Sequence, residues 1–420
     1  MSVDLPPSSS PDVRMRGFAR RTTVEAALAW VDRQVTCLPG ERISVWQAAG
    51  RVLAADVVSR IEVPAFARSM MDGYALRAAD TLGATQYNRF DLQIIGQSLA
   101  GTPFGGAVEP HQAVRIMTGA PLPAGADAVL PAEKVEIHND RLLVLDEIPP
   151  GKNVGQRGED VFAGSVVLQS GRVLRPQDLG LLSSIGQAEV EVVRKPRVRI
   201  VVTGNELLPA GTMPVGARIA DANGPMLAAL VARDGGCVTD PMTAGNYLVL
   251  DEPSTILAAM QSDADVVLVS GGSSVGQEDH APTLLAKHGE LAIHGIAMRP
   301  SSPTGMGLLE HRIVLLLPGN PVSCLCAYDF FAGRAIRLLG GRQADWPYWR
   351  VRLPLARKLV SQVGRVDYAR VRIIDNQVEP LAISGASILS STTIADGFVV
   401  VPADSEGFPA EAEVDVFLYD

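Results

Sequence analysis

Residues 266–276 read Val-Val-Leu-Val-Ser-Gly-Gly-Ser-Ser-Val-Gly, an apolar run that passes directly into a glycine-rich loop. Two further apolar runs, at 198–202 and 313–317, also lead into loops that contain glycine, at 203–207 and 318–323. In a parallel α/β sheet such loops lie at the carboxyl ends of the strands, where ligands bind. The three loops together therefore predict a ligand pocket.

The segment around these loops alternates between strand-like and helix-like patterns. The expected strands are 198–202, 237–239, 266–269 and 313–317, and the expected helices are 222–233, 253–262, 281–287 and 321–339. This alternation predicts a doubly wound parallel α/β domain. Because a chain of 420 residues is too long for one ordinary core, we expect two to four domains. The α/β segment would be one of them, so the predicted fold class is α/β multidomain.

Other patterns flank this domain. From about Ile61 to Ala163 short apolar runs alternate with glycine and proline, which predicts an all-β barrel or sandwich. After Gly341 the chain returns to β-like runs, which predicts a small C-terminal β domain. Near the N-terminus a helix is expected over 22–37, and the Pro- and Ser-rich residues 1–21 are expected to form a disordered tail.

Composition narrows the class of protein. The net charge of -9 leaves no basic stripe for nucleic acid, and no apolar stretch approaches the ~20 residues that span a membrane. The four cysteines show no metal-ligand spacing, and Cys324 and Cys326 lie in an apolar stretch, so we expect these two to be small core residues. The sequence therefore predicts a cytoplasmic, reduced protein that binds neither nucleic acid nor membrane.

The loop residues suggest how an anion would bind. Asn320 can cap the last helix and Pro321 suits its first position, so free N–H groups at that helix start would face the pocket. Ser270, Gly271 and Gly272 offer a hydroxyl and bare backbone N–H groups, a cradle for phosphate. A well-built helix start with no ligand remains the alternative for the third loop.

Acidic residues accompany the cradle. Glu206, Asp221 and Asp279 follow strands of the α/β domain and would gather at one sheet edge. Carboxylates repel phosphate unless a cation lies between them, and Mg²⁺ takes one or two carboxylates while sharing its other positions with phosphate and water. The three acids therefore predict a metal–phosphate site, with ordinary helix caps as the alternative. In the β-rich region, Asp72 and Asp160 lie in loops where a plain turn is equally open.

Five motifs in a fixed order resemble one family. They are Ser-Met-Met-Asp-Gly-Tyr-Ala at 69–75, Arg-Ile-Met-Thr-Gly-Ala-Pro at 115–121, Arg-Gly-Glu-Asp at 157–160, the Ser-Gly-Gly loop at 270–279 and Pro-Gly-Asn-Pro-Val-Ser at 318–323. The ordered set resembles the MoeA family of molybdenum cofactor biosynthesis, also known as the gephyrin E domain. Each motif alone is weak, whereas the set is specific.

The resemblance implies a domain organisation. After the tail at 1–21, it implies an extended linker domain (22–61 and 164–194), a β-rich domain (62–163), a MogA-like α/β domain (195–343) and a C-terminal β domain (344–420). It also implies a reaction in which adenylylated molybdopterin and molybdate are taken up, the pyrophosphate bond is cleaved with Mg²⁺, and AMP and molybdenum cofactor are released. The implied enzyme is a homodimer with its site between subunits. A molybdopterin adenylyltransferase and apo-molybdoenzymes are the further partners implied.

The resemblance carries roles onto individual residues. The implied catalytic residues are Asp72, Asp160 and Asp279. The implied metal ligands are Glu206, Asp221 and Asp279. The implied substrate-binding residues are Thr118, Ser270, Gly271, Gly272, Ser274, Gly276, Arg299, Ser302, Pro318, Gly319, Asn320 and Ser323.

The chain also departs from the family pattern. Where the family commonly reads Lys-Pro-Gly-Lys-Pro, this chain has Arg299-Pro300-Ser301-Ser302-Pro303, so one lysine has become Ser302. Asn205 stands where an Asp is usual. A divergent paralogue that binds cofactor or a partner with reduced or no turnover is therefore the alternative function. A molybdopterin adenylyltransferase is a third interpretation, which the β-rich domain disfavours.

Overall fold

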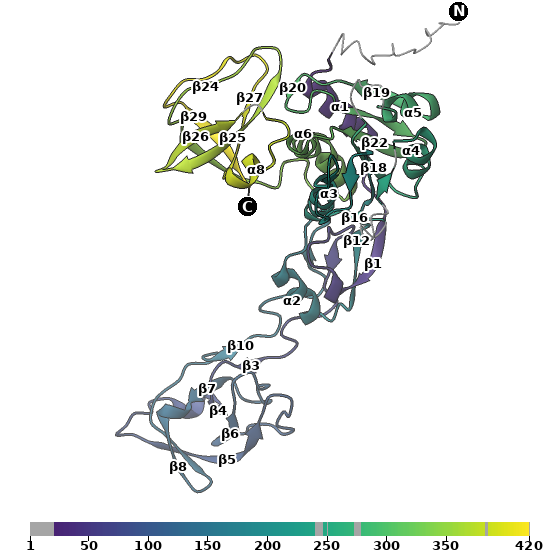
Figure 1. Ribbon diagram of the computed structural model, residues 1–420. Coiled ribbons are helices and arrows are strands. Elements are labelled where there is room, and N and C mark those ends of the chain that lie inside the picture. The colour runs from purple at the N-terminus through teal and green to yellow at the C-terminus, as the bar shows by residue number, and fades with distance from the viewer. Residues whose placement is uncertain (1–20, 240–246, 250, 273–278, 383–384, 420) are drawn as a thin grey trace, which may run out of the picture. The chain divides into compact units, whose positions relative to one another are not determined.

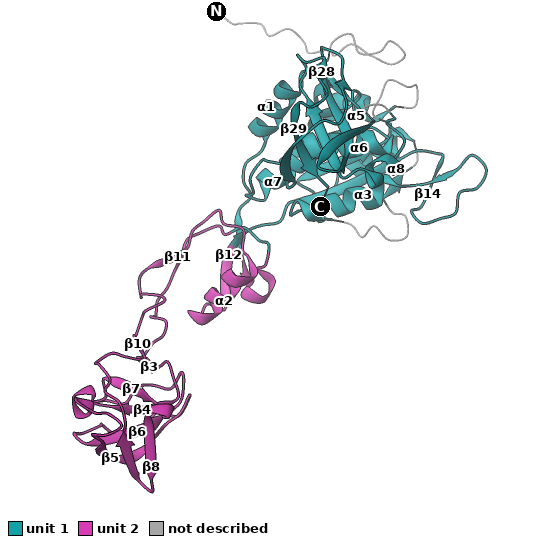
Figure 2. Cartoon of the chain, turned by 90° about the vertical axis from the view of Figure 1, so that its left-hand side faces the viewer, with its two compact units in different colours: residues 1–41, 50–52, 192–420 teal, residues 42–49, 53–191 magenta. Residues whose placement is uncertain are grey.

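A computed structural model describes residues 21–239, 247–249, 251–272, 279–382 and 385–419. The chain forms two structural units, shown in different colours in Figure 2. Unit 1 comprises residues 1–41, 50–52 and 192–420, and unit 2 comprises residues 42–49 and 53–191. No helix among the described residues is long and apolar enough to cross a membrane.

A seven-stranded sheet forms the centre of unit 1. Its order is β16-β13-β18-β22-β21-β19, with β17 also paired to β13. The strands are β13 (Arg197–Thr203), β16 (Cys237–Val238), β17 (Leu248–Val249), β18 (Val266–Ser270), β19 (Glu290–His294), β21 (Gly305–Leu309) and β22 (Arg312–Leu317). β13, β16, β17, β18 and β22 are parallel, as expected, whereas β21 and β19 add an antiparallel edge that the helix–strand alternation did not reveal.

Side-chain alternation explains why both sheet faces are covered. Along β18, Val267 and Val269 pack against α4 and α5, whereas Val266 and Leu268 lie in the core cluster that includes α1, α3 and the last helices. Figure 1 shows α3 and the α4–α5 pair on opposite sides of β18 and β22. Helices therefore cover both faces of the parallel sheet, which confirms the predicted doubly wound fold. Strands buried on both faces also explain the continuous apolar runs in the sequence. The helices are α1 (Val24–Gln34), α3 (Asn223–Arg233), α4 (Pro253–Met260) and α5 (Ala281–His288).

The last expected helix, 321–339, is interrupted. It consists of α6 (Pro321–Ala327), a π-helical turn η4 (Tyr328–Ala332) and α7 (Gly333–Leu339). Cys324 and Cys326 on α6 are fully buried, as expected of core residues, and burial raises the pKa of the Cys324 thiol to about 12. α1 packs against α7 and η4, so the first helix belongs to the core of unit 1.

Two neighbouring parallel strands, β13 and β18, start at one half-buried carboxylate. Asp265 accepts hydrogen bonds from both Arg194 terminal nitrogens, at 2.9 and 2.8 Å, and from the Arg197 N–H at 2.7 Å. Burial alone would raise the pKa of Asp265, but the bonds from Arg194 and Arg197 outweigh it and lower that pKa below its usual value. The charged carboxylate therefore stabilises the folded state.

The variant Asp265→Asn tests this contribution. We expect it to lower the free energy of unfolding by about 1–3 kcal/mol at pH 7, because hydrogen bonds to a charged group are replaced by neutral ones. Since the folded-state pKa is depressed, the stabilisation is present above the unfolded pKa of about 3.9 and is lost as the pH falls through the folded value. Urea unfolding should show a gap between wild type and variant that narrows from pH 7 to pH 3. An equal gap at both pH values would contradict the ionic explanation.

A second large sheet of unit 1 forms the C-terminal β domain that the sequence predicts. Its sheet has the order β20-β25-β27-β29-β23, with β26 paired to β25. The elements are β20 (Met298–Arg299), β23 (Trp349–Pro354), β24 (Leu359–Val360), β25 (Val366–Ile374), β26 (Gln377–Ala382), α8 (Ser390–Ile394), β27 (Gly397–Val401), β28 (Gly407–Phe408) and β29 (Glu413–Leu418). β20 comes from the α/β part of the chain and pairs in parallel with β25, which joins the two sheets of unit 1.

Unit 2 is largely β structure, as expected between Ile61 and Ala163. Its six-stranded sheet has the order β7-β4-β6-β5-β9-β8, with β5 and β6 parallel and the other neighbours antiparallel. The strands are β4 (Gly73–Leu76), β5 (Phe90–Ser98), β6 (Gln112–Ile116), β7 (Ala128–Pro131), β8 (Val135–His138) and β9 (Arg141–Val144). Leu76, Leu92 and Leu142 lie fully buried in its core.

Short elements complete the chain. Two-stranded sheets pair β1 (Gly40–Ser44) with β12 (Glu189–Val193), β2 (Val57–Val58) with β11 (Val166–Leu168), β3 (Arg68–Ser69) with β10 (Val154–Gly155), and β14 (Leu207–Leu208) with β15 (Ile219–Ala220). The helical elements are η1 (Val45–Gln47), η2 (Ala78–Thr81), η3 (Ala132–Lys134) and α2 (Pro176–Ser184).

Candidate functional site

The three glycine-containing loops meet at the carboxyl edge of the unit 1 sheet. Register places Val202 of β13 opposite Ser270 of β18, and Ser270 opposite Leu317 of β22, so the three strands end together. The residues that follow line a pocket of about 660 Å³. A pocket at this edge is where a doubly wound sheet binds its ligand, and the predicted convergence of the loops is what the structure shows.

One asparagine holds two of the loops together. The Asn223 side-chain nitrogen donates to the Ser270 hydroxyl at 2.9 Å and to the Gly319 carbonyl at 2.7 Å. Its side-chain oxygen is buried and has no hydrogen-bond partner among the described residues. Our sequence interpretation did not include Asn223 in the site, although its place at the start of the helix after Asp221 was the available signal. It both fixes the cradle and leaves an acceptor for a ligand donor.

Gly271 is required by close backbone approach. Its φ is +95°, and a Cβ atom there would lie 2.2 Å from the Thr203 carbonyl oxygen of the neighbouring strand. Its N–H donates to the Leu317 carbonyl at 3.2 Å, so the residue connects the ends of β18 and β22. The expectation of a bare N–H group at Gly271 is therefore wrong, because the neighbouring strand end takes this donor. No side chain fits at this position without moving β13 or β18.

The variant Gly271→Ala should therefore damage the pocket and the fold together. We expect a loss of about 2–4 kcal/mol in the free energy of unfolding, from the positive φ and the clash with the Thr203 carbonyl. Chemical denaturation measures it, with Gly216→Ala as control, because Gly216 also has a positive φ but lies on an exposed loop. A loss no larger than that of the control would show that the close approach is unimportant.

The pocket wall is acidic. Glu206, Asp221, Asp251 and Asp279 line it, and the described lining residues include no lysine, arginine or histidine. The sequence analysis predicted three of these acids and missed Asp251. Asp251 accepts from the Thr203 hydroxyl, and from the Asn205 N–H at 3.3 Å, so it also ties the first loop to the turn after β17. An anionic ligand in this pocket needs a cation from elsewhere.

Asp221 has two roles that the sequence left as alternatives. It is buried and accepts from the Asn223 N–H at 2.8 Å and the Gly224 N–H at 3.0 Å, which caps the start of α3. It also lines the pocket. Burial raises the pKa of Asp221, and the two N–H bonds lower it less. Capping and a place in the pocket are thus compatible.

The predicted metal ligands share the pocket without forming a complete cage. Within the described part of the chain, no group of three or more His, Cys, Asp or Glu side chains is arranged to hold a metal ion. Glu206 is exposed and Asp279 half-buried, so both carboxylates are accessible from the pocket that they line. This arrangement suits Mg²⁺, which is commonly held by one or two carboxylates together with substrate phosphates.

The third loop differs in detail from expectation. Pro318, Gly319 and Asn320 line the pocket, but the Asn320 side chain makes no capping hydrogen bond. Its carbonyl instead accepts from the Cys324 N–H at 2.9 Å, the ordinary first bond of α6. Ser323 is buried in α6, where its carbonyl accepts from the Ser301 hydroxyl. Ser323 is not among the described residues that line the pocket.

Two of the implied substrate-binding residues, Arg299 and Ser302, are not among the described residues that line the pocket. The Arg299 guanidinium pairs with Asp367 of β25, through Nε at 2.9 Å and a second terminal contact, and it does not line the pocket. The Ser302 hydroxyl accepts from Arg21 Nε at 2.9 Å. Arg299 therefore joins the two sheets of unit 1, because a buried carboxylate in β25 needs a paired cation. Ser274 and Gly276 lie outside the described residues.

Three family models of known proteins match most of the chain. Residues 22–186 match the model of the MoeA N-terminal region (domain I and II), 199–337 the probable molybdopterin binding domain, and 352–419 the MoeA C-terminal region (domain IV). The molybdopterin molybdenumtransferase 2 of Mycobacterium tuberculosis is 33% identical, with 96% of this chain and 99% of that protein covered. The chain belongs to the MoeA family.

Two further relatives support the same family assignment. The molybdopterin molybdenumtransferase of Staphylococcus aureus is 29% identical, covering 94% of this chain and 95% of that protein. The crystal structure of the molybdopterin biosynthesis MoeA protein from Pyrococcus horikoshii superimposes with a TM-score of 0.80 at 30% identity, covering 96% of this chain and all of that one. The predicted family and fold are confirmed, and the chain stands among enzymes named molybdopterin molybdenumtransferase.

The remaining predicted residues of this MoeA-family chain lie in unit 2. Asp72 accepts from the Thr118 N–H and the Thr118 hydroxyl, both at 2.7 Å. These two hydrogen bonds lower the pKa of Asp72, and the bond from the Thr118 N–H contributes more than the bond from its hydroxyl. The structure thus brings Asp72 and Thr118, from two separate motifs, together. Asp160 is exposed on a turn, where its N–H donates to the Val63 carbonyl at 3.0 Å.

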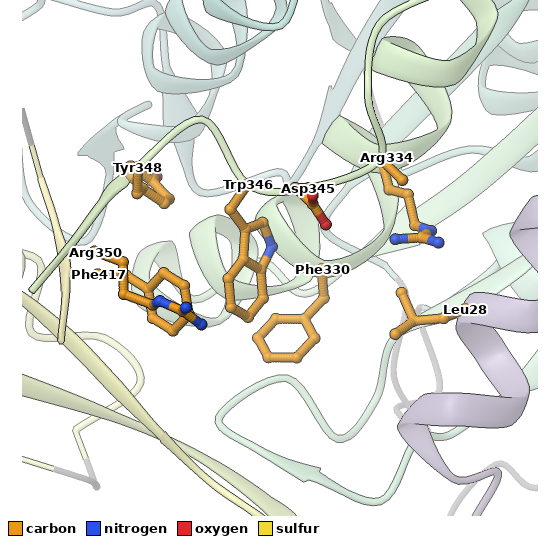
Figure 3. Close-up of a pocket in the computed structure, with 9 residues that line it drawn as sticks. Leu28, Phe330, Arg334, Asp345, Trp346, Tyr348, Arg350 and Phe417 are labelled. Carbon is orange, nitrogen blue, oxygen red and sulfur yellow. The ribbon is translucent and has the colours of Figure 1, made fainter. Parts of the chain in front are cut away.

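A second cavity, of about 510 Å³, lies between the α/β part and the C-terminal sheet of unit 1. Figure 3 shows Trp346 and Phe330 at its centre, with Arg334 and Leu28 on one side and Arg350 and Phe417 on the other. Arg334 donates to both oxygens of Asp32, at 2.6 and 2.9 Å. The aromatic side chains that line this cavity hold the two sheets of unit 1 together. We assign the cavity no part in the reaction.

Proposed function

We propose that this chain inserts molybdate into adenylylated molybdopterin, with Mg²⁺-dependent release of AMP. The observation that supports this most directly is the acidic pocket at the carboxyl ends of β13, β18 and β22, which has a backbone cradle and four carboxylates but no basic side chain among its described lining residues. A pyrophosphate linkage could enter such a pocket only with a divalent cation between its oxygens and the carboxylates.

Individual residues would divide the work. Glu206, Asp221 and Asp279 would hold Mg²⁺, whose chemistry would be to neutralise charge on the pyrophosphate. Gly272 would offer its backbone N–H to a phosphate oxygen, because the Gly271 N–H already donates to the Leu317 carbonyl. The Asn223 side-chain oxygen, which has no hydrogen-bond partner among the described residues, would accept a hydrogen bond from the ligand.

The proposal includes a homodimer, with the acids of the β-rich domain of one subunit acting at the α/β pocket of the other. The family resemblance supports this assignment, because Asp72 and Asp160 belong to the motifs that define it. Molybdate and the nucleotide-linked pterin would be the substrates, and a molybdopterin adenylyltransferase and apo-molybdoenzymes the partners before and after the reaction. The cytoplasm would be the compartment.

The test is AMP release from adenylylated molybdopterin by purified protein. We expect release that requires molybdate and Mg²⁺ together, with sulfate in place of molybdate as the control anion. Release at the same rate without molybdate, or binding of the substrate with no release, would contradict the proposal. The second result would instead favour a binding protein without turnover, the alternative suggested by Ser302 in place of the family's lysine.

A further inference from the structure

The acidic pocket wall raises the question of which cation meets the substrate at the rim. Arg299 is paired with Asp367. A second arginine approaches from the far end of the sequence, because Arg21 Nε donates to the Ser302 hydroxyl at 2.9 Å. Ser302 immediately precedes Pro303, which lines the pocket. Arg21 therefore contacts the rim, although 281 positions separate it from Ser302.

The rim turn that Arg21 contacts is firmly held. Ser301 is 2% exposed, and its hydroxyl donates to the Ser323 carbonyl of α6, the helix whose first residue Pro321 lines the same pocket. Thr304 closes the turn, since its hydroxyl donates to the Ser301 carbonyl at 2.8 Å. Ser302 and Pro303 thus have a defined position relative to the third loop.

The backbone beside Arg21 is held by the same segment. The Thr22 N–H donates to the Gly295 carbonyl at 2.9 Å, and the Thr22 carbonyl accepts from Ala297 at 2.8 Å. Between them, the Ile296 N–H donates to the Ser302 carbonyl at 2.8 Å. Residues 295–297 therefore hold both Thr22 and Ser302, and Arg21 needs little ordering on binding.

The Arg21 guanidinium keeps most of its donors available. It has five N–H donors, and its hydrogen bond to another described residue is the one from Nε to Ser302. Arg21 is exposed, and no carboxylate pairs with it in the described ranges, unlike Arg299 and Arg334. A guanidinium fork matches a phosphate in bidentate geometry.

We propose that Arg21, positioned by Ser302, is a substrate-binding residue at the pocket rim that takes a phosphate of the pyrophosphate-bearing substrate. This inference rests on the proposed function for the identity of the substrate. It assigns to the rim the cation that the described pocket wall lacks. The bond from Nε to Ser302 orients the fork, and the two terminal nitrogens remain to meet the phosphate.

Inorganic pyrophosphate with Mg²⁺ is the probe, titrated calorimetrically into the full chain. We expect Arg21→Ala to weaken its binding about 10- to 100-fold, as loss of a charged hydrogen bond predicts. Arg21→Lys should fall between, because an ammonium cannot bind as a fork. In the AMP-release assay, Arg21→Ala should raise KM by a similar factor and leave kcat nearly unchanged. Arg33→Ala is the matched control, since Arg33 is an exposed arginine on α1 of the same unit.

A substitution at position 302 distinguishes a specific phosphate contact from a general effect of surface charge. Ser302→Lys in the Arg21→Ala background puts a cation back at the rim, so we expect pyrophosphate binding to recover. In the wild-type background the same lysine would face Arg21, and we expect no gain because like charges repel. Recovery in the first background without gain in the second supports the inference. A gain of equal size in both would overturn it.

The outcomes also distinguish this inference from the proposed function. If wild type releases no AMP but Arg21→Ala weakens pyrophosphate binding relative to Arg33→Ala, the function fails and the role of Arg21 as an anion contact stands. If wild type releases AMP and the two variants behave alike, the role of Arg21 fails and the function stands. No detectable pyrophosphate binding by wild type overturns the role of Arg21. The thermal unfolding midpoint of each variant confirms that it is folded.

Discussion

Replacing Asp279 with alanine should abolish AMP release while leaving the protein folded. Asp279 lies just before α5, half-buried, in the wall of the acidic pocket. If its carboxylate helps to hold Mg²⁺ against the pyrophosphate, its loss removes charge stabilisation at the reacting group, and we expect kcat to fall by at least about 100- to 1000-fold. The rate at saturating substrate, measured over a Mg²⁺ titration, tests this.

The matched control is Asp263→Ala. Asp263 is an aspartate of the same unit whose side chain is 86% exposed and pairs with Arg197, away from the pocket lining. Both variants lose one negative charge, so a general electrostatic effect would change both rates alike. We expect Asp263→Ala to retain the wild-type rate. An Asp279→Ala enzyme that also keeps it would remove Asp279 from the site.

Asp72→Ala should eliminate turnover as well, although Asp72 belongs to unit 2. The carboxylate is exposed and accepts two hydrogen bonds from Thr118. Water can take over these two donors, so we expect little change in the stability of unit 2. The hydrogen bonds from Thr118 lower the pKa of Asp72 and so keep it charged, as a residue that acts on a cation or a phosphate-bound metal should be. The measurement is again AMP release at saturating substrate.

Mixing the two inactive variants tests the proposed site between subunits. If Asp72 of one subunit serves the pocket that holds Asp279 of its partner, a dimer with one variant of each kind has one intact site and one doubly altered site. Random exchange of subunits should then restore about a quarter of the wild-type activity. If both residues act within one chain, every site carries a substitution and no activity returns. A mixture that stays inactive after confirmed subunit exchange would therefore refute the intersubunit site.

The sequence predicted the α/β fold well because its cause is local. Runs such as 266–269 and 313–317 are apolar at every position, as strands buried on both faces must be. The antiparallel strands β19 and β21 escaped notice because Gly305 and Gly307 weaken the strand pattern. The π-helical turn at 328–332 was missed because a single irregular turn leaves the apolar spacing of a helix nearly unchanged.

The site was predicted in its parts and not in its connections. Glu206, Asp221 and Asp279 were expected to converge, since each follows a strand of one parallel sheet, and all three line the pocket. Arg299 was expected to bind substrate, but a carboxylate from the C-terminal sheet pairs with it. Asp251 was missed, and Asn223 was given no role, because their importance lies in hydrogen bonds to loops 46–96 positions away. No spacing rule reveals such partners.

The sequence by itself determined the family, the parallel sheet and the gathering of glycine loops and acids at its edge, because these follow from local periodicity and ordered motifs. The tertiary structure decided which polar groups meet across long separations. Hydrogen bonds from Asn223 link Ser270 to Gly319. Arg299 forms an ion pair with Asp367, and Arg21 donates a hydrogen bond to Ser302. The physical reason is that burial makes a polar group take whichever partner the packed chain brings within reach, and packing depends on the whole fold.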